Sequence, residues 1–276
     1  MTMSQAPERF RLGDLSEELF RAIGTTIRDF TVPLIAQVRG GPPGRETLYG
    51  SATLVTICDQ PFLLTATHVW EKLDSQPYIG IALTQHMSRF VINREYLSPT
   101  SLATRRSDEW GPDLTLVTLP SSHVGRMKAH KSFYNLSKRQ AEMLGRSPDR
   151  EGGFWGVSGF VAEESVLDKP ELGLAGLLCL GGIDFLREAE GFDYLEVGVD
   201  RVTTPDLPNS FGGVSGGGLW HFNVIRPPGS ADLFWDGRIQ LEGVAFYETA
   251  VDSGRQLIRC HGRKSLYVWV SNMSVA

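Results

Sequence analysis

The amino-acid sequence predicts an all-β protein made of two small β-barrels, preceded by an N-terminal helix. Short apolar runs of strand length alternate with turns rich in glycine and proline, of which the chain has 30 and 15. The runs form two groups of about six, one on each side of a basic segment. We therefore expect an extension at 1–30, a first barrel at 31–120, a connector at 121–150 and a second barrel at 151–276.

The N-terminal extension is expected to hold one amphipathic helix. Residues 1–13 are expected to be loosely attached, and Asp14 to cap a helix over about 15–29, with Glu17 completing a capping box. Apolar residues recur at helical spacing, at Leu15, Leu19, Phe20, Ile23, Ile27 and Phe30. This apolar stripe is expected to pack on the body of the protein. The alternative is that it binds a regulatory protein partner.

The strands are predicted from apolar or alternating runs that lie next to turn signals. The first barrel is expected to contain Val32–Val38, Thr47–Cys58, Phe62–Thr67, Tyr78–Leu83, Phe90–Asn93 and Leu114–Leu119, with a turn at Asp59–Pro61. The second is expected to contain Gly153–Val161, Leu172–Leu180, Tyr194–Val199, Gly217–Val224, Leu241–Tyr247 and Leu266–Val270. In the connector, Ser137–Leu144 is predicted to be helical. The connector's basic residues are either solvated or a docking patch for an acidic partner.

Composition argues against several classes of partner. The net charge of −5 gives no strong attraction to nucleic acid, and no apolar run approaches the roughly 18 residues of a membrane span. The N-terminal residues do not have the pattern of a secretory signal. Three separated cysteines, Cys58, Cys179 and Cys260, are expected to be reduced core residues. We expect a cytoplasmic protein without nucleic-acid or membrane partners.

No cofactor or metal ion is expected. The sequence has neither a phosphate-binding loop nor a dinucleotide-binding fingerprint. The histidines outside the predicted active site show no metal-ligand spacing; they are His86, His123, His130, His221 and His261.

A glycine-rich stretch, Asn209–Trp220, surrounds a single reactive side chain, Ser215. Glycine lets backbone approach a ligand closely, and successive N–H groups of such a loop can point at one developing negative charge. We predict that Ser215 is a nucleophile and that the N–H groups of Gly213 and Ser215 form an oxyanion hole. The alternative is a flexible loop with an incidental serine.

Two further polar residues stand directly against core-type sequence. His68 follows the run Phe62–Thr67, and Asp113 precedes the run Leu114–Leu119. An unpaired buried carboxylate is costly, and an imidazole can be its partner. A serine hydroxyl needs such a base, and the base needs a third group to orient it. We predict a catalytic triad of His68, Asp113 and Ser215, although each residue taken singly also fits a structural role.

These residues lie in segments that resemble the trypsin-like serine proteases of the chymotrypsin fold, in particular bacterial members that are not secreted. Leu63–His68 is similar to the family's Leu-Thr-Ala-Ala-His, Asp113–Val117 to Asp-Ile-Ala-Leu-Leu, and Gly213–Gly217 to Gly-Asp/Asn-Ser-Gly-Gly. Gly50–Val55 and Gly156–Phe160 resemble strands of the two barrels. The resemblance covers nearly all of the chain after the predicted helix. It implies two six-stranded antiparallel β-barrels, with the active site in the cleft between them.

The sequence departs from this family at several positions. Val214 stands where digestive members have an aspartate that pairs with a freshly cut N-terminus, so the oxyanion loop must be held in another way. The strand ending at Tyr247 lacks the family's serine, which supports the triad aspartate. By resemblance, Asn209 and Ser210 lie at the base of the substrate pocket. Tyr247 and Glu248 line it, and Glu248 near its mouth would favour a basic substrate residue.

The first functional prediction is a serine endopeptidase that cleaves a protein or peptide substrate through an acyl-enzyme on Ser215. Two alternatives stay open. One is a non-catalytic peptide-binding module on a protease fold, suggested by Val214 and the missing serine. The other is a regulatory protease that is inactive until a partner orders its oxyanion loop. Covalent labelling of Ser215 separates the first prediction from the second.

Overall fold

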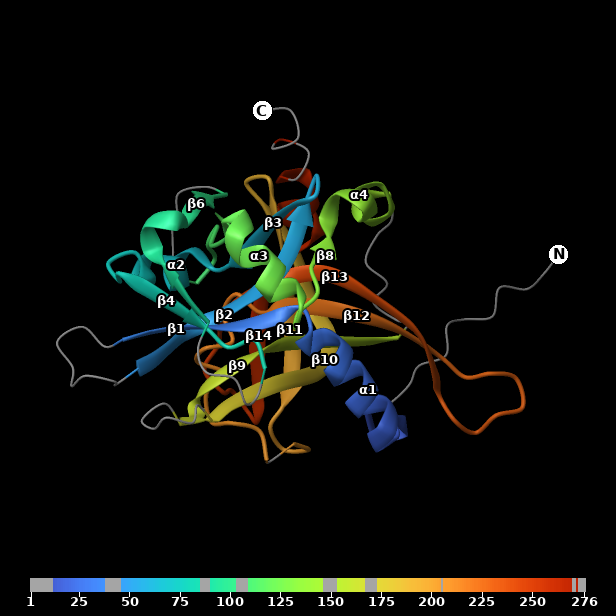
Figure 1. The fold of residues 1–276 in the computed structure, drawn as a ribbon. Helices are drawn as coiled ribbons and strands as arrows, with labels where there is room; N and C mark the ends of the chain where they lie inside the picture. The colour runs from blue at the N-terminus through green and yellow to red at the C-terminus, as the bar shows by residue number, and fades with distance from the viewer. Residues whose placement is uncertain are drawn as a thin grey trace.

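The computed structural model describes residues 12–37, 46–84, 90–102, 109–145, 153–166, 173–204, 206–269 and 272. In this part the chain is mostly β, as predicted, and its strands form two sheets that meet side by side (Figure 1). Most of the segment expected to be loosely attached, residues 1–11, lies outside the described part. The connector's last residues, 146–150, and the side chain of Cys179 also lie outside it.

The first sheet is open among the described residues, not the closed six-stranded barrel that we predicted. Its hydrogen-bonded order is β5-β4-β1-β2-β3-β7-β6, with β8 added in parallel to β2. The strands are β1 (Thr31–Gln37), β2 (Glu46–Ile57), β3 (Gln60–Thr65), β4 (Tyr78–Ile81), β5 (Phe90–Asn93), β6 (Ser98–Ser101), β7 (Thr115–Thr118) and β8 (Tyr134–Asn135). The sequence did not indicate β6 and β8, because β6 is fully exposed and β8 has only two residues.

The second sheet closes into a six-stranded barrel in the order β10-β11-β14-β13-β12-β9. Its strands are β9 (Phe154–Val166), β10 (Gly173–Ala189), β11 (Phe192–Asp200), β12 (Gly218–Ile225), β13 (Phe234–Glu248) and β14 (Arg255–His261). The hairpin between β12 and β13 extends away from the barrel (Figure 1).

One predicted strand of the second barrel, Leu266–Val270, is wrong. The described part of this segment is a π-helix, Lys264–Val268, and the sixth strand is β14. The sequence did not indicate β14, because several of its buried side chains are polar and interrupt the apolar pattern. One of them, Arg259, is almost fully buried and pairs with Glu196 of β11 at 2.6 Å.

The N-terminal helix α1 (Glu17–Arg28) lies within the predicted range, but its cap is not Asp14. Ser16 is the N-cap, and its side chain accepts a hydrogen bond from the N–H of Leu19 at 3.2 Å. The helix buries Ile23 and Ile27 completely, because residues four apart share one helix face. The predicted apolar stripe therefore packs on the body of the protein.

A buried lysine fixes the far end of α1. The Nζ of Lys131 donates hydrogen bonds to the carbonyl oxygens of Arg28, at 2.8 Å, and Thr31, at 3.0 Å. Burial lowers the pKa of Lys131 from 10.5 to about 8. The bond to Arg28 satisfies a carbonyl group that the helix end leaves without an intrahelical partner, and the bond to Thr31 ties the helix end to the start of β1.

The connector is more structured than its composition indicated. The predicted helix is confirmed as α4 (Leu136–Leu144), which follows β8, and a second helix, α3 (Ser121–Lys128), precedes it. In the first half of the chain, α2 (Thr67–Leu73) directly follows β3. Short 3₁₀ turns occur at Leu12–Asp14 and Arg94–Tyr96.

The turn between β2 and β3 corrects the prediction for one cysteine. Cys58 and Asp59 both have positive φ, 47° and 66°, and form the two-residue turn, which we had placed at Asp59–Pro61. Cys58 is therefore exposed and not a core residue, whereas Cys260 is fully buried as predicted.

One hydrophobic cluster spans both sheets. It includes Val55 of the first sheet, Trp220 of the second barrel and both buried isoleucines of α1. Trp220 packs at 5.5 Å between ring centroids against both Phe30, which follows α1, and Tyr134 of β8. Because this core is shared, the helix, the first sheet and the barrel are fixed against one another.

Candidate active site

His68 and Asp113 come together because the strands that precede and follow them are paired. β3 and β7 are antiparallel with Thr65 opposite Thr115. His68 lies three residues beyond Thr65, in the first turn of α2, and Asp113 lies two residues before Thr115. Both side chains therefore reach the same end of the sheet.

The Asp113 carboxylate holds His68 through two hydrogen bonds. Its Oδ1 accepts the backbone N–H of His68 at 2.9 Å, and its Oδ2 lies 2.6 Å from the imidazole Nδ1. Asp113 is fully buried, whereas 16% of the His68 side chain remains exposed. With Nδ1–H directed at the carboxylate, Nε2 becomes the free acceptor of a neutral imidazole. This is the arrangement that a general base requires.

The backbone of Asp113 has a second partner, His261, which the sequence did not indicate. The Asp113 N–H donates to Nε2 of His261 at 2.8 Å, across from the first sheet to the end of β14. His261 is fully buried, and aromatic rings surround it: Phe246 lies 4.8 Å away and Tyr194 lies 5.2 Å away between centroids. Burial lowers the pKa of His261 from 6.5 to about 4. The ring is therefore neutral, with its proton on Nδ1.

Ser215 lies in a loop that only glycine neighbours permit. Gly216 has φ +91°, and a Cβ on it would lie 2.0 Å from the carbonyl oxygen of Ser51 in β2. A Cβ on Gly217 would lie 1.7 Å from the carbonyl oxygen of Ser158 in β9. The glycines therefore let the loop fit between the two sheets.

The third predicted triad residue, Ser215, and the neighbour of His68 both lie next to Gly50, but the hydroxyl of Ser215 is hydrogen-bonded elsewhere. A Cβ on Gly50 would lie 2.6 Å from Val69, the neighbour of His68, and 3.0 Å from the carbonyl oxygen of Ser215. The hydroxyl of Ser215 donates to the carbonyl oxygen of Phe246 at 3.3 Å. Among the described residues no hydrogen bond joins Ser215 to His68.

The N–H groups of the predicted oxyanion hole differ from those of neighbouring residues in their hydrogen bonding. The N–H groups of Gly212, Val214, Gly216 and Gly217 donate to acceptors within the protein, at 2.8 to 2.9 Å. Within the described part of the chain, the N–H groups of Gly213 and Ser215 donate to none. Buried backbone N–H groups are nearly always paired. Gly213 and Ser215 are partly exposed, and their N–H groups, two positions apart in the sequence, have no acceptor in the described chain and can bind an anionic oxygen.

Three of the four residues predicted to form a substrate pocket, Asn209, Ser210 and Glu248, are held by hydrogen bonds within the protein. Ser210 Oγ donates to Glu248 at 2.7 Å, and the Phe211 N–H donates to the same carboxylate at 2.6 Å. Asn209 donates to Glu163 of β9 at 2.6 Å, and hydrogen bonds from Asn209 and Ser210 lower the pKa of that carboxyl.

Tyr247, next to Glu248 on β13, is partly buried, and its ring lies 5.3 Å from the guanidinium carbon of Arg259. Glu248 also accepts from Gln256 at 3.1 Å. The Glu248 carboxylate, which we expected to favour a basic substrate residue, thus already accepts three hydrogen bonds, from Ser210, Phe211 and Gln256. The sequence did not indicate that Arg259, Gln256 and Glu163 contact the predicted pocket residues, because each lies on a strand far from the loop in the sequence.

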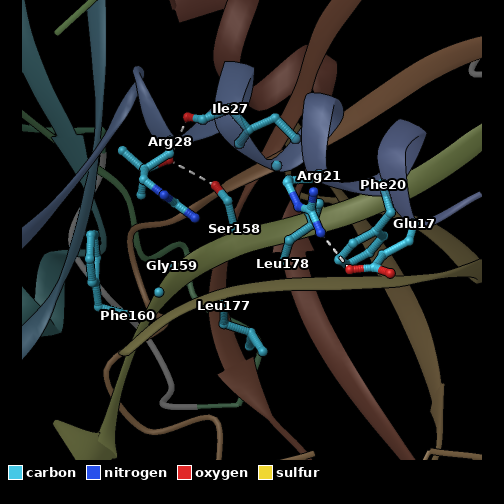
Figure 2. Close-up of a pocket in the computed structure, with 13 residues that line it drawn as sticks. Glu17, Phe20, Arg21, Ile27, Arg28, Ser158, Gly159, Phe160, Leu177 and Leu178 are labelled. Carbon is cyan, nitrogen blue, oxygen red and sulfur yellow. Dashed lines mark hydrogen bonds and ion pairs between the residues drawn. The ribbon is translucent and has the colours of Figure 1, made fainter. Parts of the chain in front are cut away.

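A separate cavity of about 510 Å³ lies between α1 and the barrel (Figure 2). Phe20, Gly24 and Ile27 of α1 form one wall, and Ser158–Phe160 of β9 form part of the other. A Cβ on Gly159 would lie 2.9 Å from the Cα of Val214. β9 therefore lies between this cavity and the loop that carries Ser215.

Several further features bear on the class of protein. Among the described residues, no group of three or more His, Cys, Asp or Glu side chains could hold a metal ion. Within the same part of the chain, no helix has both the length and the apolar character needed to cross a membrane. No protein-family model matches this chain, and no curated protein matches it.

Proposed function

We propose that this protein is a serine endopeptidase that cleaves peptide bonds through an acyl-enzyme on Ser215. The observation that carries the proposal is the buried Asp113 carboxylate, which binds the Nδ1 and the backbone N–H of His68 beside the Ser215 loop. The unpaired N–H groups of Gly213 and Ser215 support it. The finer fold assignment, a chymotrypsin-like relation between the open sheet and the closed barrel, is part of the same proposal, as is a cytoplasmic location.

In the proposed reaction, Ser215 Oγ leaves the Phe246 carbonyl, transfers its proton to Nε2 of His68 and bonds to the substrate carbonyl carbon. Asp113 stabilises the imidazolium that forms. The N–H groups of Gly213 and Ser215 bind the negative oxygen, and one such donor contributes about 3–4 kcal/mol in known enzymes. The C–N bond then breaks and the leaving amine takes the proton from His68. Water, deprotonated by His68, hydrolyses the acyl ester and restores Ser215.

The test is covalent labelling. We expect a fluorophosphonate to phosphonylate the purified protein at Ser215, identified by peptide mass spectrometry, and Ser215→Ala to abolish the adduct. His68→Ala should slow labelling by at least about a hundredfold, because general-base assistance of that size is lost. A folded wild-type protein that never forms the adduct would count against the proposal.

The hydrogen bond from Ser215 to Phe246 favours a second candidate, a non-catalytic peptide-binding module. In that case the hydroxyl keeps this bond and His68 never receives its proton. Peptide binding that survives Ser215→Ala, together with no turnover of a peptide library by wild-type protein, would identify this candidate.

The third candidate, a regulatory protease, places its partner at α1, where the cavity of about 510 Å³ adjoins β9. It differs from the first in requiring the partner for labelling. Phe20→Ala, at an exposed side chain that lines this cavity, should then weaken partner-dependent labelling. In the first candidate, labelling needs no partner.

A further inference from the structure

The loop that carries Ser215 contributes no charged side chain to its own stabilisation. From Asn209 to Gly217 it contains only neutral residues. Val214, at its centre, is buried with 1% of its surface exposed and packs against Gly159 of β9. Apolar packing holds a side chain in place but does not set the orientation of peptide groups. Hydrogen bonds must therefore fix the direction of the loop's N–H groups.

Ser51 of β2 supplies these hydrogen bonds from the opposite sheet. Its hydroxyl donates to the carbonyl oxygen of Gly213 at 2.7 Å and accepts the N–H of Phe160 at 2.9 Å. Its backbone N–H donates to the carbonyl oxygen of Ser215 at 2.8 Å. Ser51 is fully buried, and Thr65 Oγ1 donates to its carbonyl oxygen at 2.7 Å. One residue thus joins β2, β9 and both ends of the oxyanion segment.

Four consecutive carbonyl groups of the loop accept hydrogen bonds, two of them from Ser51. The carbonyl of Gly212 accepts from Ala162, that of Gly213 from Ser51, that of Val214 from Gly217, and that of Ser215 from Ser51 again. A planar peptide that is fixed at its carbonyl is also fixed at the N–H of the next residue. Ser51 therefore fixes the peptides that carry the N–H groups of Val214 and Gly216. These two peptides lie on either side of the one that carries the Ser215 N–H, and the first also adjoins the one that carries the Gly213 N–H. The N–H groups left without a protein acceptor in the described chain are those of Gly213 and Ser215.

We infer that Ser51 is the positioning residue of the oxyanion loop, and that it holds the loop in a binding-ready form before any substrate or partner arrives. The inference rests on the proposed function. Ser51 touches the backbone of the loop and not the reacting atoms, so it acts through the carbonyl groups of Gly213 and Ser215, whose peptides adjoin those that carry the two oxyanion N–H groups. Because its contacts are all internal to the protein, the loop requires neither an ion pair nor a bound partner to keep its N–H groups oriented.

The test compares Ser51→Ala with a matched control. Ser51→Ala removes both hydroxyl contacts and keeps the backbone bond to Ser215. The control is Thr53→Val, which removes another buried hydroxyl of β2 that bonds the loop at Gly216, at 3.2 Å, outside the oxyanion segment. Ser51→Cys, which keeps a weak donor of similar size, serves as the conservative variant.

We measure the second-order rate of fluorophosphonate labelling at Ser215 between pH 5 and 9. Ser51→Ala should lower the plateau about tenfold to a hundredfold, because misdirected N–H groups lose oxyanion stabilisation. Its midpoint pH should not move, because the His68–Asp113 pair is intact. Thr53→Val should stay within about threefold of wild type, and Ser51→Cys should lie between the two.

Amide hydrogen exchange at Val214 and Gly216 separates this inference from the proposed function. If wild type labels and a folded Ser51→Ala variant labels equally fast, the inference is overturned while the proposed function stands. If wild type never labels, the proposed function fails, and exchange alone decides the role of Ser51. Faster exchange in Ser51→Ala than in Thr53→Val supports the inference, and equal exchange overturns it.

Discussion

At the scale of single residues, the carboxylate of Asp113 and the peptide that carries it are fixed from both sheets. The carboxylate bonds His68 on its own sheet, and the Asp113 N–H bonds His261 of β14. The resemblance to trypsin-like proteases raised a doubt, since the supporting serine is absent. In this protein His261 bonds the backbone N–H of Asp113, whereas the family's serine supports the carboxylate. A neutral imidazole is needed for this, since only an unprotonated Nε2 can accept a hydrogen bond.

His261 should give the protein an acid-sensitive stability. The folded state holds it neutral with a pKa of about 4, whereas the unfolded chain binds its proton below about pH 6.5. Its contribution is therefore complete above pH 6.5 and is lost as the pH falls toward 4, by up to about 3 kcal/mol. Urea unfolding of wild type and His261→Gln, which keeps an acceptor but no titrating ring, should show this difference between pH 7 and 4. Parallel stability curves for the two proteins would contradict the assignment.

At the scale of elements, α1 is an integral part of the fold and not a detached arm. Its buried face carries Ile23 and Ile27, and Lys131 of the connector donates a hydrogen bond to its last carbonyl group, that of Arg28. The cavity lies on the side of α1 that faces β9, where the partly exposed Phe20 lines it together with Glu17 and Arg21 (Figure 2). A helix in this position can stabilise the body and still present a surface to a partner.

Truncation of the buried face should therefore lower global stability. We expect Ile23→Ala to reduce the free energy of unfolding by about 2–5 kcal/mol, the usual cost of such a cavity. Phe20→Ala, at a side chain that is 38% exposed, should change it by less than about 1 kcal/mol. Urea unfolding followed by circular dichroism measures both. If Ile23→Ala speeds amide exchange only within α1 and leaves global unfolding unchanged, the helix is an independent unit.

At the scale of the whole molecule, the candidate site lies where the open sheet and the closed barrel meet. His68 follows β3 and Asp113 precedes β7 of the first sheet, and Ser215 belongs to the loop that enters the barrel at β12. Two hydrogen bonds join the halves at this site. Ser51 of the first sheet donates to Gly213 in the Ser215 loop, and His261 of the barrel accepts from Asp113. The site's geometry therefore depends on the two halves keeping their relative position.

The shared core predicts that the two halves unfold together. Trp220 is fully buried at the junction, and Trp220→Ala should cost about 3–5 kcal/mol and leave a single transition. Trp235, partly buried in the projecting hairpin, provides a control whose change to alanine should cost about 1 kcal/mol. Calorimetry measures both, with equal calorimetric and van't Hoff enthalpies expected. Two resolved transitions in Trp220→Ala would show that the halves are separate folding units.

Much of the fold could be predicted because it is encoded locally. Most strands, α1 and α4 follow from apolar spacing and turn residues, which act over a few neighbours. β14 and the π-helix could not be predicted this way. A buried Arg259 on β14 is tolerated only because Glu196 of the next strand pairs with it, and that strand is far away in the sequence. The closure of one sheet and the open edges of the other likewise depend on long-range pairing.

By itself, the sequence determined which side chains can do chemistry: an imidazole and a carboxylate beside two neighbouring strands, and a serine among glycines that allow close backbone approach. Only the tertiary structure decided how they are supported. It showed that donors from the loop and from β14 bind the Glu248 carboxylate, and that Ser51 and His261 hold the two segments that carry the candidate site residues. The physical reason is that the direction of a hydrogen bond is set by both partners, and these partners lie in different sheets.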